Sequence, residues 1–411
     1  MKKTFENNNK FAKHKLYTAI FVVFMASIIV LTACTRGHTE GIKNSKLDNE
    51  SKVQATSEPG HTIAQTTEPM PSASQKSEHV NGNEPVEPDE KVKDSQQQEN
   101  SGNDIDETIA KHKPNEAGKI MVVMFHNFVE EYKSGDKYYT TTFSDFKKLL
   151  RELYDKNYRL ISMREFLNND INVPSGCIPI VFTFDDGTSG QFNLIRQGDK
   201  LVANKNSAVG IMEEFYNEHP DFGLKGTFYV NLGVSTFKGE GTLQERLQYL
   251  VDKGFEIGNH TYTHINLKKA SSAELIQKEI GMNQKVIQQL IPGYVMETLS
   301  MPYGLLSKNL QEYVYRGKFE DITYEHKGIM EVGWDPSVSP IHKNFNPLSV
   351  HRVRASGIVP VDTDLGWWLS KLSKDEQYVS DGDPRTVTVP EKMAKYVDEA
   401  RLKGRNLKVY K

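Results

Sequence analysis

Short apolar runs alternate with amphipathic stretches through the chain after residue 118. The runs are bounded by Gly, Pro and polar residues, and they predict strands at Lys119–Phe125, Ile178–Phe184, Gly226–Val230, Gly254–Gly258 and Glu297–Met301. Between them, Thr142–Asn157 and Ser272–Leu290 have the periodicity of helices with one apolar face. Strands that alternate with helices predict an α/β fold with a parallel sheet, either open or closed.

The N-terminal residues have a different pattern. Several lysines precede an apolar stretch at Leu16–Ala33, which is typical of a secretory leader. The stretch ends in Leu31-Thr32-Ala33-Cys34, which resembles a bacterial lipobox with Cys34 as the acylated residue. We interpret residues 1–34 as a lipoprotein signal peptide, with an uncleaved membrane anchor as the alternative. Both interpretations place the rest of the chain outside the cytoplasmic membrane and attached to it.

Residues 35–118 have a composition that favours disorder. No aromatic residue occurs between Met25 and Met124, and the stretch is rich in Ser, Thr, Glu, Gln, Asn, Lys and Pro. Such a segment cannot bury enough apolar surface to offset its conformational entropy, so we expect an extended tether. Residues 119–411 remain as one folded domain, a size that suits a single barrel. The formal net charge of −3 and the lack of a basic patch argue against nucleic acid as a partner, and no protein partner is indicated.

Two adjacent carboxylates end the strand predicted at Ile178–Phe184. Asp185 and Asp186 carry charges that a buried strand cannot hold without solvent or a cation, and neighbouring side chains point in different directions. His260 and His264 follow a later strand, and their spacing lets one helical turn or a tight loop bring both rings to one ion. Each pattern is common by itself, but together they predict a divalent metal site with a spare carboxylate.

The polar motifs share one structural position. Each follows the carboxyl end of a predicted strand, where the active sites of parallel α/β folds gather. The run Ile120–Phe125 delivers His126 to the same edge. We therefore add His126 to the candidate site.

The motifs also resemble those of a known family. Thr183–Gly187, His260–His264 and Met301–Gly304 resemble the successive motifs of polysaccharide deacetylases, the NodB-homology enzymes of carbohydrate esterase family four. Gly226–Val230 is similar to the strand between the first two motifs, and the resemblance covers about residues 119–360. It implies a deformed (β/α) barrel of about seven units. It also implies a hydrolase that uses a metal ion to remove acetyl groups from a polysaccharide.

The resemblance assigns a role to each residue of the site. Asp186, His260 and His264 are expected to hold the metal, with zinc favoured and cobalt, nickel or iron as alternatives. Asp185 is expected to take the proton of the attacking water. The backbone N–H of Tyr303 resembles the family's donor to the oxyanion.

The proton donor to the leaving amine is expected to be a histidine. Most family members use a histidine in a late Leu-x-His motif, from which Leu348-Ser349-Val350-His351 departs by one residue. A subgroup that acts on poly-N-acetylglucosamine has this histidine after the first strand, in a context similar to Phe125-His126. We favour His126 and keep His351 as the alternative.

A second departure concerns the partner of the catalytic base. Ser300 stands where the family's third motif has an arginine that pairs with the base, so another group must orient Asp185. Arg352 and Arg354 are both candidates for this role. Asp335 loosely resembles the fourth motif of the family.

Three segments stay outside this interpretation. Thr188–Gly223 is longer than the usual connection, and it forms either a lid, a cleft wall or a surface helix. Trp367 and Trp368 suggest a carbohydrate platform but also fit a partly buried pair. The C-terminal residues predict a strand at Arg385–Val389 and a helix at Glu391–Leu402 that complete the domain.

These observations predict a lipid-anchored, extracytoplasmic deacetylase that acts on acetylated amino-sugar polysaccharide. The expected substrate contains N-acetylglucosamine. Peptidoglycan, chitin-like oligosaccharides and acetylated xylan are alternatives, and so is a non-catalytic glycan-binding lipoprotein that retains the metal site.

Overall fold

The computed structural model describes residues 106–133, 135, 138–356 and 363–411. The predicted signal peptide, Cys34 and most of the predicted tether lie outside these residues. None of the helices in the described ranges is both long and apolar enough to cross a membrane.

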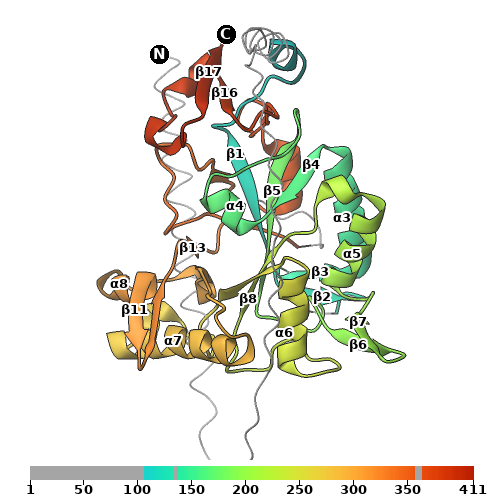
Figure 1. The fold of residues 1–411 in the computed structure, drawn as a ribbon, viewed down its shortest axis with the longest axis vertical. Helices are drawn as coiled ribbons and strands as arrows, with labels where there is room; N and C mark the ends of the chain where they lie inside the picture. The colour runs from blue at the N-terminus through green and yellow to red at the C-terminus, as the bar shows by residue number, and fades with distance from the viewer. Residues whose placement is uncertain (1–105, 134, 136–137, 357–362) are drawn as a thin grey trace, which may run out of the picture. The chain divides into compact units, whose positions relative to one another are not determined.

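A curled sheet of mainly parallel strands forms the centre of the fold (Figure 1). Its parallel strands are β1 (Lys119–Phe125), β4 (Tyr158–Ile161), β5 (Ile178–Asp185), β8 (Thr227–Val230), β9 (Glu256–Asn259), β10 (Thr298–Ser300), β13 (Gly328–Met330) and β15 (Val353–Arg354). The order across the sheet is β13-β10-β9-β8-β5-β1, β15 pairs with β1, and β4 pairs with the first half of β5. One antiparallel strand, β14 (Ser337–Val338), also pairs with the start of β1.

Residues 350–354 join the two ends of this curled sheet. Val350 forms a parallel bridge with Met330 of β13, and three residues later β15 pairs with β1. Seven parallel positions therefore follow one another around the curl: β13, β10, β9, β8, β5, β1 and the segment 350–354. This arrangement confirms the predicted deformed (β/α) barrel. Arg352 lies in the middle of this joining segment.

The remaining strands form two-stranded sheets outside the barrel. They are β2 (Asn127–Val129) with β3 (Thr140–Thr142), β6 (Leu194–Gln197) with β7 (Lys200–Ala203), β11 (Arg316–Phe319) with β12 (Ile322–Glu325), and β16 (Thr386–Pro390) with β17 (Asn406–Tyr410).

Helices cover the outer face of the curled sheet (Figure 1). After β1, the α-helices are α3 (Phe143–Asp155), α4 (Met163–Leu167), α5 (Ala208–Glu218), α6 (Leu243–Asp252), α7 (Ala273–Leu290), α8 (Glu312–Tyr315), α9 (Leu365–Lys371) and α10 (Glu391–Ala394). The short 3-10 helices are η1 (Pro220–Phe222), η2 (Leu267–Lys269), η3 (Pro302–Gly304), η4 (Lys308–Leu310) and η5 (Glu399–Arg401). Hydroxyl caps begin the two longest helices: Thr142 accepts the Asp145 N–H, and Ser272 accepts the Leu275 N–H.

Successive side chains of β5 point to opposite faces of the sheet and pack into two different apolar layers. Ile180, Phe182 and Phe184 pack in the layer between the sheet and the outer helices. Val181 packs in a second cluster with residues of β1, β8 and β13, and Asp185 has the same parity. Because both faces of the strand are covered, its sequence is a continuous apolar run that ends at the carboxylates.

The predicted strands are all present, as are the helices predicted at Thr142–Asn157 and Ser272–Leu290, with ends that differ by at most two residues. The sequence did not predict β4, β13 and β15, which are only two to four residues long.

Two boundaries were wrong. The tether was expected to extend to residue 118, but Asn115, Glu116 and Ala117 are buried, and the Glu116 N–H donates to Thr388 of β16. The helix expected at Glu391–Leu402 is only α10 and η5, because Val397 between them bridges to His342. Tertiary contacts overrode local preference in both places.

The long segment Thr188–Gly223 contains the hairpin β6–β7, helix α5 and η1. The first residues of α5 are buried in the outer layer together with residues of α3. This segment therefore belongs to the helical layer of the barrel rather than to a separate lid.

Candidate active site

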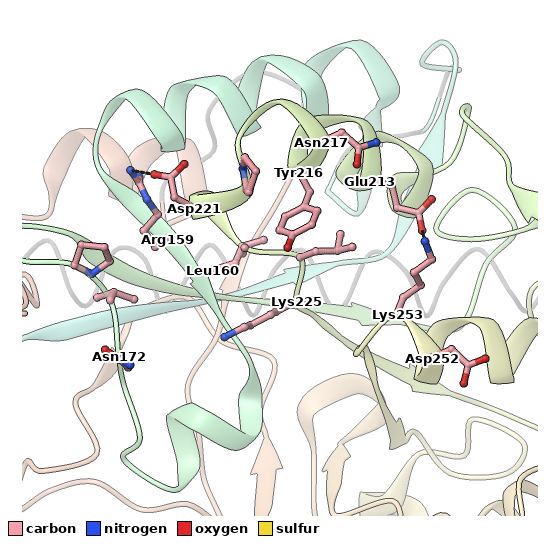
Figure 2. A pocket seen from close by; sticks show the side chains of 15 residues that line it. Arg159, Leu160, Asn172, Glu213, Tyr216, Asn217, Asp221, Lys225, Asp252 and Lys253 are labelled. Carbon is pink, nitrogen blue, oxygen red and sulfur yellow. Dashed lines mark hydrogen bonds and ion pairs between the residues drawn. The ribbon is translucent and has the colours of Figure 1, made fainter.

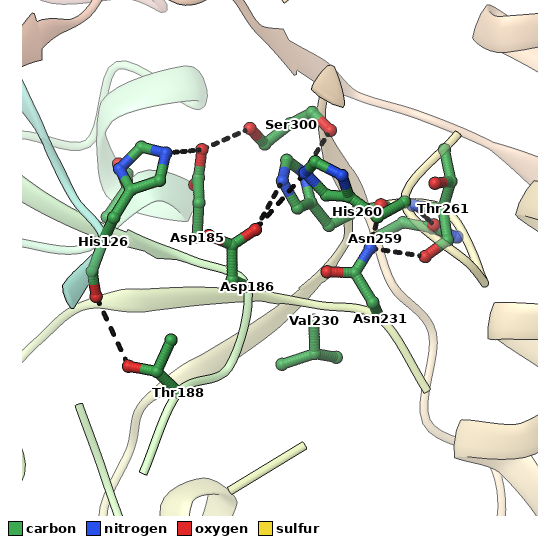
Figure 3. A network of polar contacts seen from close by, with 12 residues as sticks. His126, Asp185, Asp186, Thr188, Val230, Asn231, Asn259, His260, Thr261 and Ser300 are labelled. Carbon is green, nitrogen blue, oxygen red and sulfur yellow. Dashed lines mark hydrogen bonds and ion pairs between the residues drawn. The ribbon is translucent and has the colours of Figure 1, made fainter. Parts of the chain in front are cut away.

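The candidate residues meet at the carboxyl ends of the parallel strands, as the sequence predicts. His126 follows β1, Asp185 and Asp186 end β5, and His260 follows β9. Figure 3 shows His126 on one side of the two aspartates and His260 on the other. The strand ends thus assemble one cluster from segments far apart in the sequence.

Asp186, His260 and His264 form a group that can hold a metal ion. Their ligand atoms lie within 4.8 Å of one another. Oδ1 of Asp186 is 3.5 Å from Nε2 of His260 and 3.3 Å from Nε2 of His264. Nδ1 of His260 is 2.8 Å from the carbonyl of Ser300, which can only accept, so Nδ1 carries a hydrogen and Nε2 is the nitrogen that faces Asp186. Two imidazoles and one carboxylate suit zinc or a similar divalent ion.

Helix α7 holds the loop that carries both histidines. Asn283 donates to the Val230 carbonyl at 2.7 Å and to Oδ1 of Asn259 at 3.0 Å. The same Asn259 oxygen accepts the Thr261 N–H at 2.9 Å. One turn earlier on the helix, the Glu279 carboxylate accepts both the N–H and the hydroxyl of Thr263. The loop geometry is therefore set by buried polar side chains of a long helix.

The backbone of the cluster is strained at four non-glycine residues. Asp186, Thr261, His264 and Tyr303 have φ values of 80°, 61°, 59° and 62°. Such left-handed conformations are unfavourable for side-chain-bearing residues and concentrate at functional sites. Three of these four residues are members of the predicted site.

Arg352 supplies the cation that the third motif lacks. Its Nη1 and Nη2 atoms donate to the two oxygens of Asp185 at 2.8 and 2.7 Å, and the pair is almost fully buried. Burial by itself raises the pKa of Asp185, but the charge of Arg352 outweighs it and holds the pKa well below its usual range. Ser300, which replaces the motif's arginine, donates its hydroxyl to the same carboxylate at 3.0 Å and accepts from Nη2 of Arg352.

His126 is the histidine beside this carboxylate. Its Nε2 lies 4.0 Å from Oδ2 of Asp185, and its side chain is mostly buried. Burial lowers the pKa of His126, and the nearby charges of Asp185 and Asp186 offset this only in part. The backbone carbonyl of His126 accepts a hydrogen bond from Gln191 at 2.6 Å, which fixes the start of the segment after β1.

His351 lies in a different environment. Nδ1 is 2.9 Å from Asp335, Nε2 is 3.9 Å from Glu331, and about half of the side chain is exposed. The hydrogen bond with Asp335 raises the pKa of His351. Within the described residues, its ion pairs are with these two carboxylates and not with Asp185.

Comparison with known proteins identifies the domain. Residues 172–317 match the family model described as polysaccharide deacetylase. The chain contains a polysaccharide deacetylase domain. This confirms the family predicted from the motifs, and the matched residues include Asp185, Asp186, both metal-site histidines and Tyr303.

The deacetylase domain is similar to a peptidoglycan-N-acetylglucosamine deacetylase, PgdA, of Listeria monocytogenes. The two are 24% identical over 180 residues, which is 41% of this chain and 33% of that protein. The chain thus covers a third of the length of this relative.

Solved structures of similar proteins include a polysaccharide deacetylase from Bacillus cereus, with 19% identity and a TM-score of 0.46, which covers 62% of this chain and 69% of that one. IcaB from Ammonifex degensii has 16% identity and a TM-score of 0.41, over 58% and 92% of the two chains. These likenesses are weak, and the assignment of the barrel rests on the strand order.

The structure also places the remaining predicted residues. Tyr303 is 58% exposed, and its ring centroid lies 5.0 Å from that of His264, at the rim of the candidate site. Trp368 of α9 donates its indole N–H to the Trp334 carbonyl, while the ring of Trp334 is exposed. The sequence did not predict that Ser300 contacts both Asp185, through its hydroxyl, and His260, through its carbonyl. A single serine in a sequence does not indicate such a role.

A separate hollow of about 600 Å³ lies near the amino ends of β5, β8 and β9 (Figure 2). Its charged side chains are largely paired: Arg159 with Asp221 at 2.7 Å and Lys253 with Glu213 at 3.2 Å. None of the motif residues lines it. The candidate site residues lie instead at the carboxyl ends of these strands.

Proposed function

We propose that this protein is a metal-dependent hydrolase that removes N-acetyl groups from an extracellular polysaccharide containing N-acetylglucosamine. The observation that carries this proposal is the Asp185–Arg352 pair, which faces the Asp186–His260–His264 group with His126 beside it. A site of this kind combines ligands for a cation, a spare carboxylate and a proton donor, which together suffice for amide hydrolysis.

Asp186, His260 and His264 would hold the cation. When bound, a divalent ion such as zinc would polarise the acetyl carbonyl and make water more acidic. The hydrogen bond from His260 to Ser300 keeps Nε2 available as a ligand, and Asn283 and Glu279 fix the loop.

Asp185 is placed to accept the proton of the attacking water. The pKa of Asp185 is low, so the carboxylate stays ionised, and Arg352 with Ser300 fixes its orientation. The C–O bond forms at the acetyl carbon, and we assign stabilisation of the developing negative charge to the backbone N–H of Tyr303.

His126 completes the reaction by giving a proton to the amine nitrogen as the C–N bond breaks. Expulsion of an amine anion is prohibitively difficult without this step. Because burial lowers the pKa of His126, the proton that it donates must arrive during turnover. Asp185, 4.0 Å away, is the group that gains a proton in the preceding step. The products are acetate and the free amino sugar.

Peptidoglycan is a second candidate substrate, favoured by the activity for which the Listeria relative is named. Its glycan shares N-acetylglucosamine with the polymer proposed above. The leader pattern supports action outside the cytoplasmic membrane, with Cys34 as the lipid anchor.

Acetate release tests this function. The protein is incubated with an N-acetylglucosamine pentamer or with purified peptidoglycan, with and without chelator. We expect release from at least one substrate, its loss with chelator, and its return with added zinc. Asp185→Asn is the inactive control. If no metal and no glycan supports release while the glycans still bind, the protein is a binding module rather than an enzyme.

A further inference from the structure

Two exposed tyrosines lie beside the candidate active site. Tyr138 and Tyr139 precede β3, and their side chains are 45% and 40% exposed. Pairing of β3 with β2, which follows His126 directly, brings this segment to the same strand end as the aspartates. The ring centroid of Tyr139 is 4.7 Å from that of His126.

Arg354 connects the two tyrosines. Its guanidinium carbon lies 5.1 Å from the ring centre of Tyr138 and 5.6 Å from that of Tyr139. Within the described residues its guanidinium forms no hydrogen bond or ion pair, and its Nε is buried without a partner. Arg352, two residues earlier, uses all three of its nitrogen atoms. The two arginines of one segment are therefore used differently, one inside the barrel and one at its rim.

We propose that Tyr138, Tyr139 and Arg354 form a binding subsite for the sugar unit next to the one that is deacetylated. This inference rests on the proposed function and names how the polymer is held. Tyrosine rings offer flat apolar faces for the C–H face of a pyranose, together with polar edges. Arg354 offers unused donors to the hydroxyl and acetamido oxygens of the sugar.

The position of this subsite follows from the contacts. Tyr139 packs on His126, which faces Asp185, so the platform begins one side chain away from the reacting group. Tyr303 packs instead on His264 of the proposed metal group. A sugar on the Tyr138 platform would thus be a neighbour along the polymer and not the reacting unit itself. Binding there would raise affinity for oligomers but not for very short substrates.

The test compares chain lengths. KM and kcat are measured for an N-acetylglucosamine pentamer and for the dimer with wild type, Tyr138→Ala, Tyr138→Phe and Arg354→Gln. We expect Tyr138→Ala and Arg354→Gln to raise KM for the pentamer about ten-fold, with kcat within about two-fold and the dimer little affected. Tyr138→Phe keeps the ring and should resemble wild type. Tyr216→Ala is the matched control, because this tyrosine is 36% exposed on α5 at the separate hollow.

Binding is measured in parallel, so that this inference and the proposed function fail separately. Calorimetry with the pentamer and the metal-free proteins should show weaker binding for Tyr138→Ala and Arg354→Gln but not for Tyr216→Ala. If wild type binds the pentamer but releases no acetate, the function is wrong and the subsite stands. Unchanged pentamer KM and binding in both variants, or equal effects on dimer and pentamer, would overturn the subsite.

Discussion

The guanidinium of Arg352 lies wholly inside the protein, and its charge is balanced by Asp185. Two hydrogen bonds join the groups directly, and Ser300, Thr183 and the Glu331 carbonyl occupy their remaining polar atoms. A buried ion pair of this kind adds little net stability, but loss of one partner leaves an uncompensated charge. The pair therefore links the integrity of the barrel to the orientation of the proposed base.

Substitution of Arg352 should reveal this dependence. We expect Arg352→Met to lower the free energy of unfolding by about 3–5 kcal/mol, because Asp185 would remain buried and unpaired. Arg354→Met, which breaks no hydrogen bond with the described residues, should cost less than about 1 kcal/mol. Urea unfolding followed by circular dichroism measures both. Equal costs in the two variants would contradict the role of the Asp185–Arg352 pair.

The two candidate acids give the second prediction at this scale. We expect His126→Ala to lower kcat by about 10²–10⁴-fold, because the leaving amine loses its proton donor. His351→Ala should retain most activity, since its ring pairs with Asp335 and Glu331. Acetate release is measured for both variants at equal metal occupancy. If only His351→Ala loses turnover, then His351 is the acid and the assignment of His126 is wrong.

At the scale of elements, α7 does more than cover the sheet. Its residue Asn283 is fully buried and bonds to the ends of two strands, through the Val230 carbonyl, the Leu232 N–H and Asn259. These contacts lead through Asn259 to the backbone of Thr261, between the metal-site histidines. A polar side chain in the middle of an amphipathic helix is explained here by the loop that it supports.

This support predicts an effect on the proposed metal site. Asn283→Leu should destabilise the protein by about 1–3 kcal/mol and also weaken zinc binding, because Leu232 and Val230 lose their partners beside the loop. Gln284→Leu is the matched control, since the adjacent Gln284 is also buried but bonds to Met296 and Tyr294 instead. Calorimetric titration with zinc should separate the two variants. Equal zinc affinities would show that α7 does not position the histidines.

Helix and strand ends illustrate what local pattern can predict. The helix predicted at Ser272–Leu290 is present as Ala273–Leu290, because its apolar residues repeat at helical spacing over the whole segment. The C-terminal helix was predicted too long, because its chain turns at Val397 to bridge His342. A contact across 55 residues of sequence leaves no periodic signal in either segment.

At the scale of the whole molecule, the first described segment and the last strands are packed together. Glu116 is buried, accepts the Thr388 N–H of β16 at 3.0 Å, and accepts the Tyr378 hydroxyl at 3.2 Å. Burial, with Asp381 nearby, raises the pKa of Glu116 to about 8. The folded protein therefore keeps a proton on this carboxyl at pH values where the unfolded chain has lost it.

The sign of the pH dependence follows from this difference. Stability from protonated Glu116 is fully present below about pH 4.5 and is lost as pH rises through about 8, because the unfolded state binds fewer protons in between. Glu116→Gln, which has no proton to lose, should flatten this decline. Urea unfolding of both proteins from pH 5 to about pH 9 measures the difference. Parallel profiles would mean that Glu116 titrates normally.

The sequence by itself determined the family, the positions of the main strands along the chain and the residues of the proposed metal group. It could do so because these signals are local: Asp185 and Asp186 end one apolar run, and His260 and His264 share one short loop. Their meeting follows from a general property of parallel sheets, whose carboxyl ends lie at one edge.

The tertiary structure alone decided the partner of the base and the extent of the domain. Arg352 and Arg354 are two residues apart, so the alternation of side chains along a strand predicts the same face for both and cannot distinguish them. Only the way residues 350–354 join β13 to β1 brings Arg352 to Asp185, 167 residues away in sequence, and leaves Arg354 at the rim with the tyrosines. Contacts between distant segments depend on the packing of the whole barrel, and no local pattern encodes them.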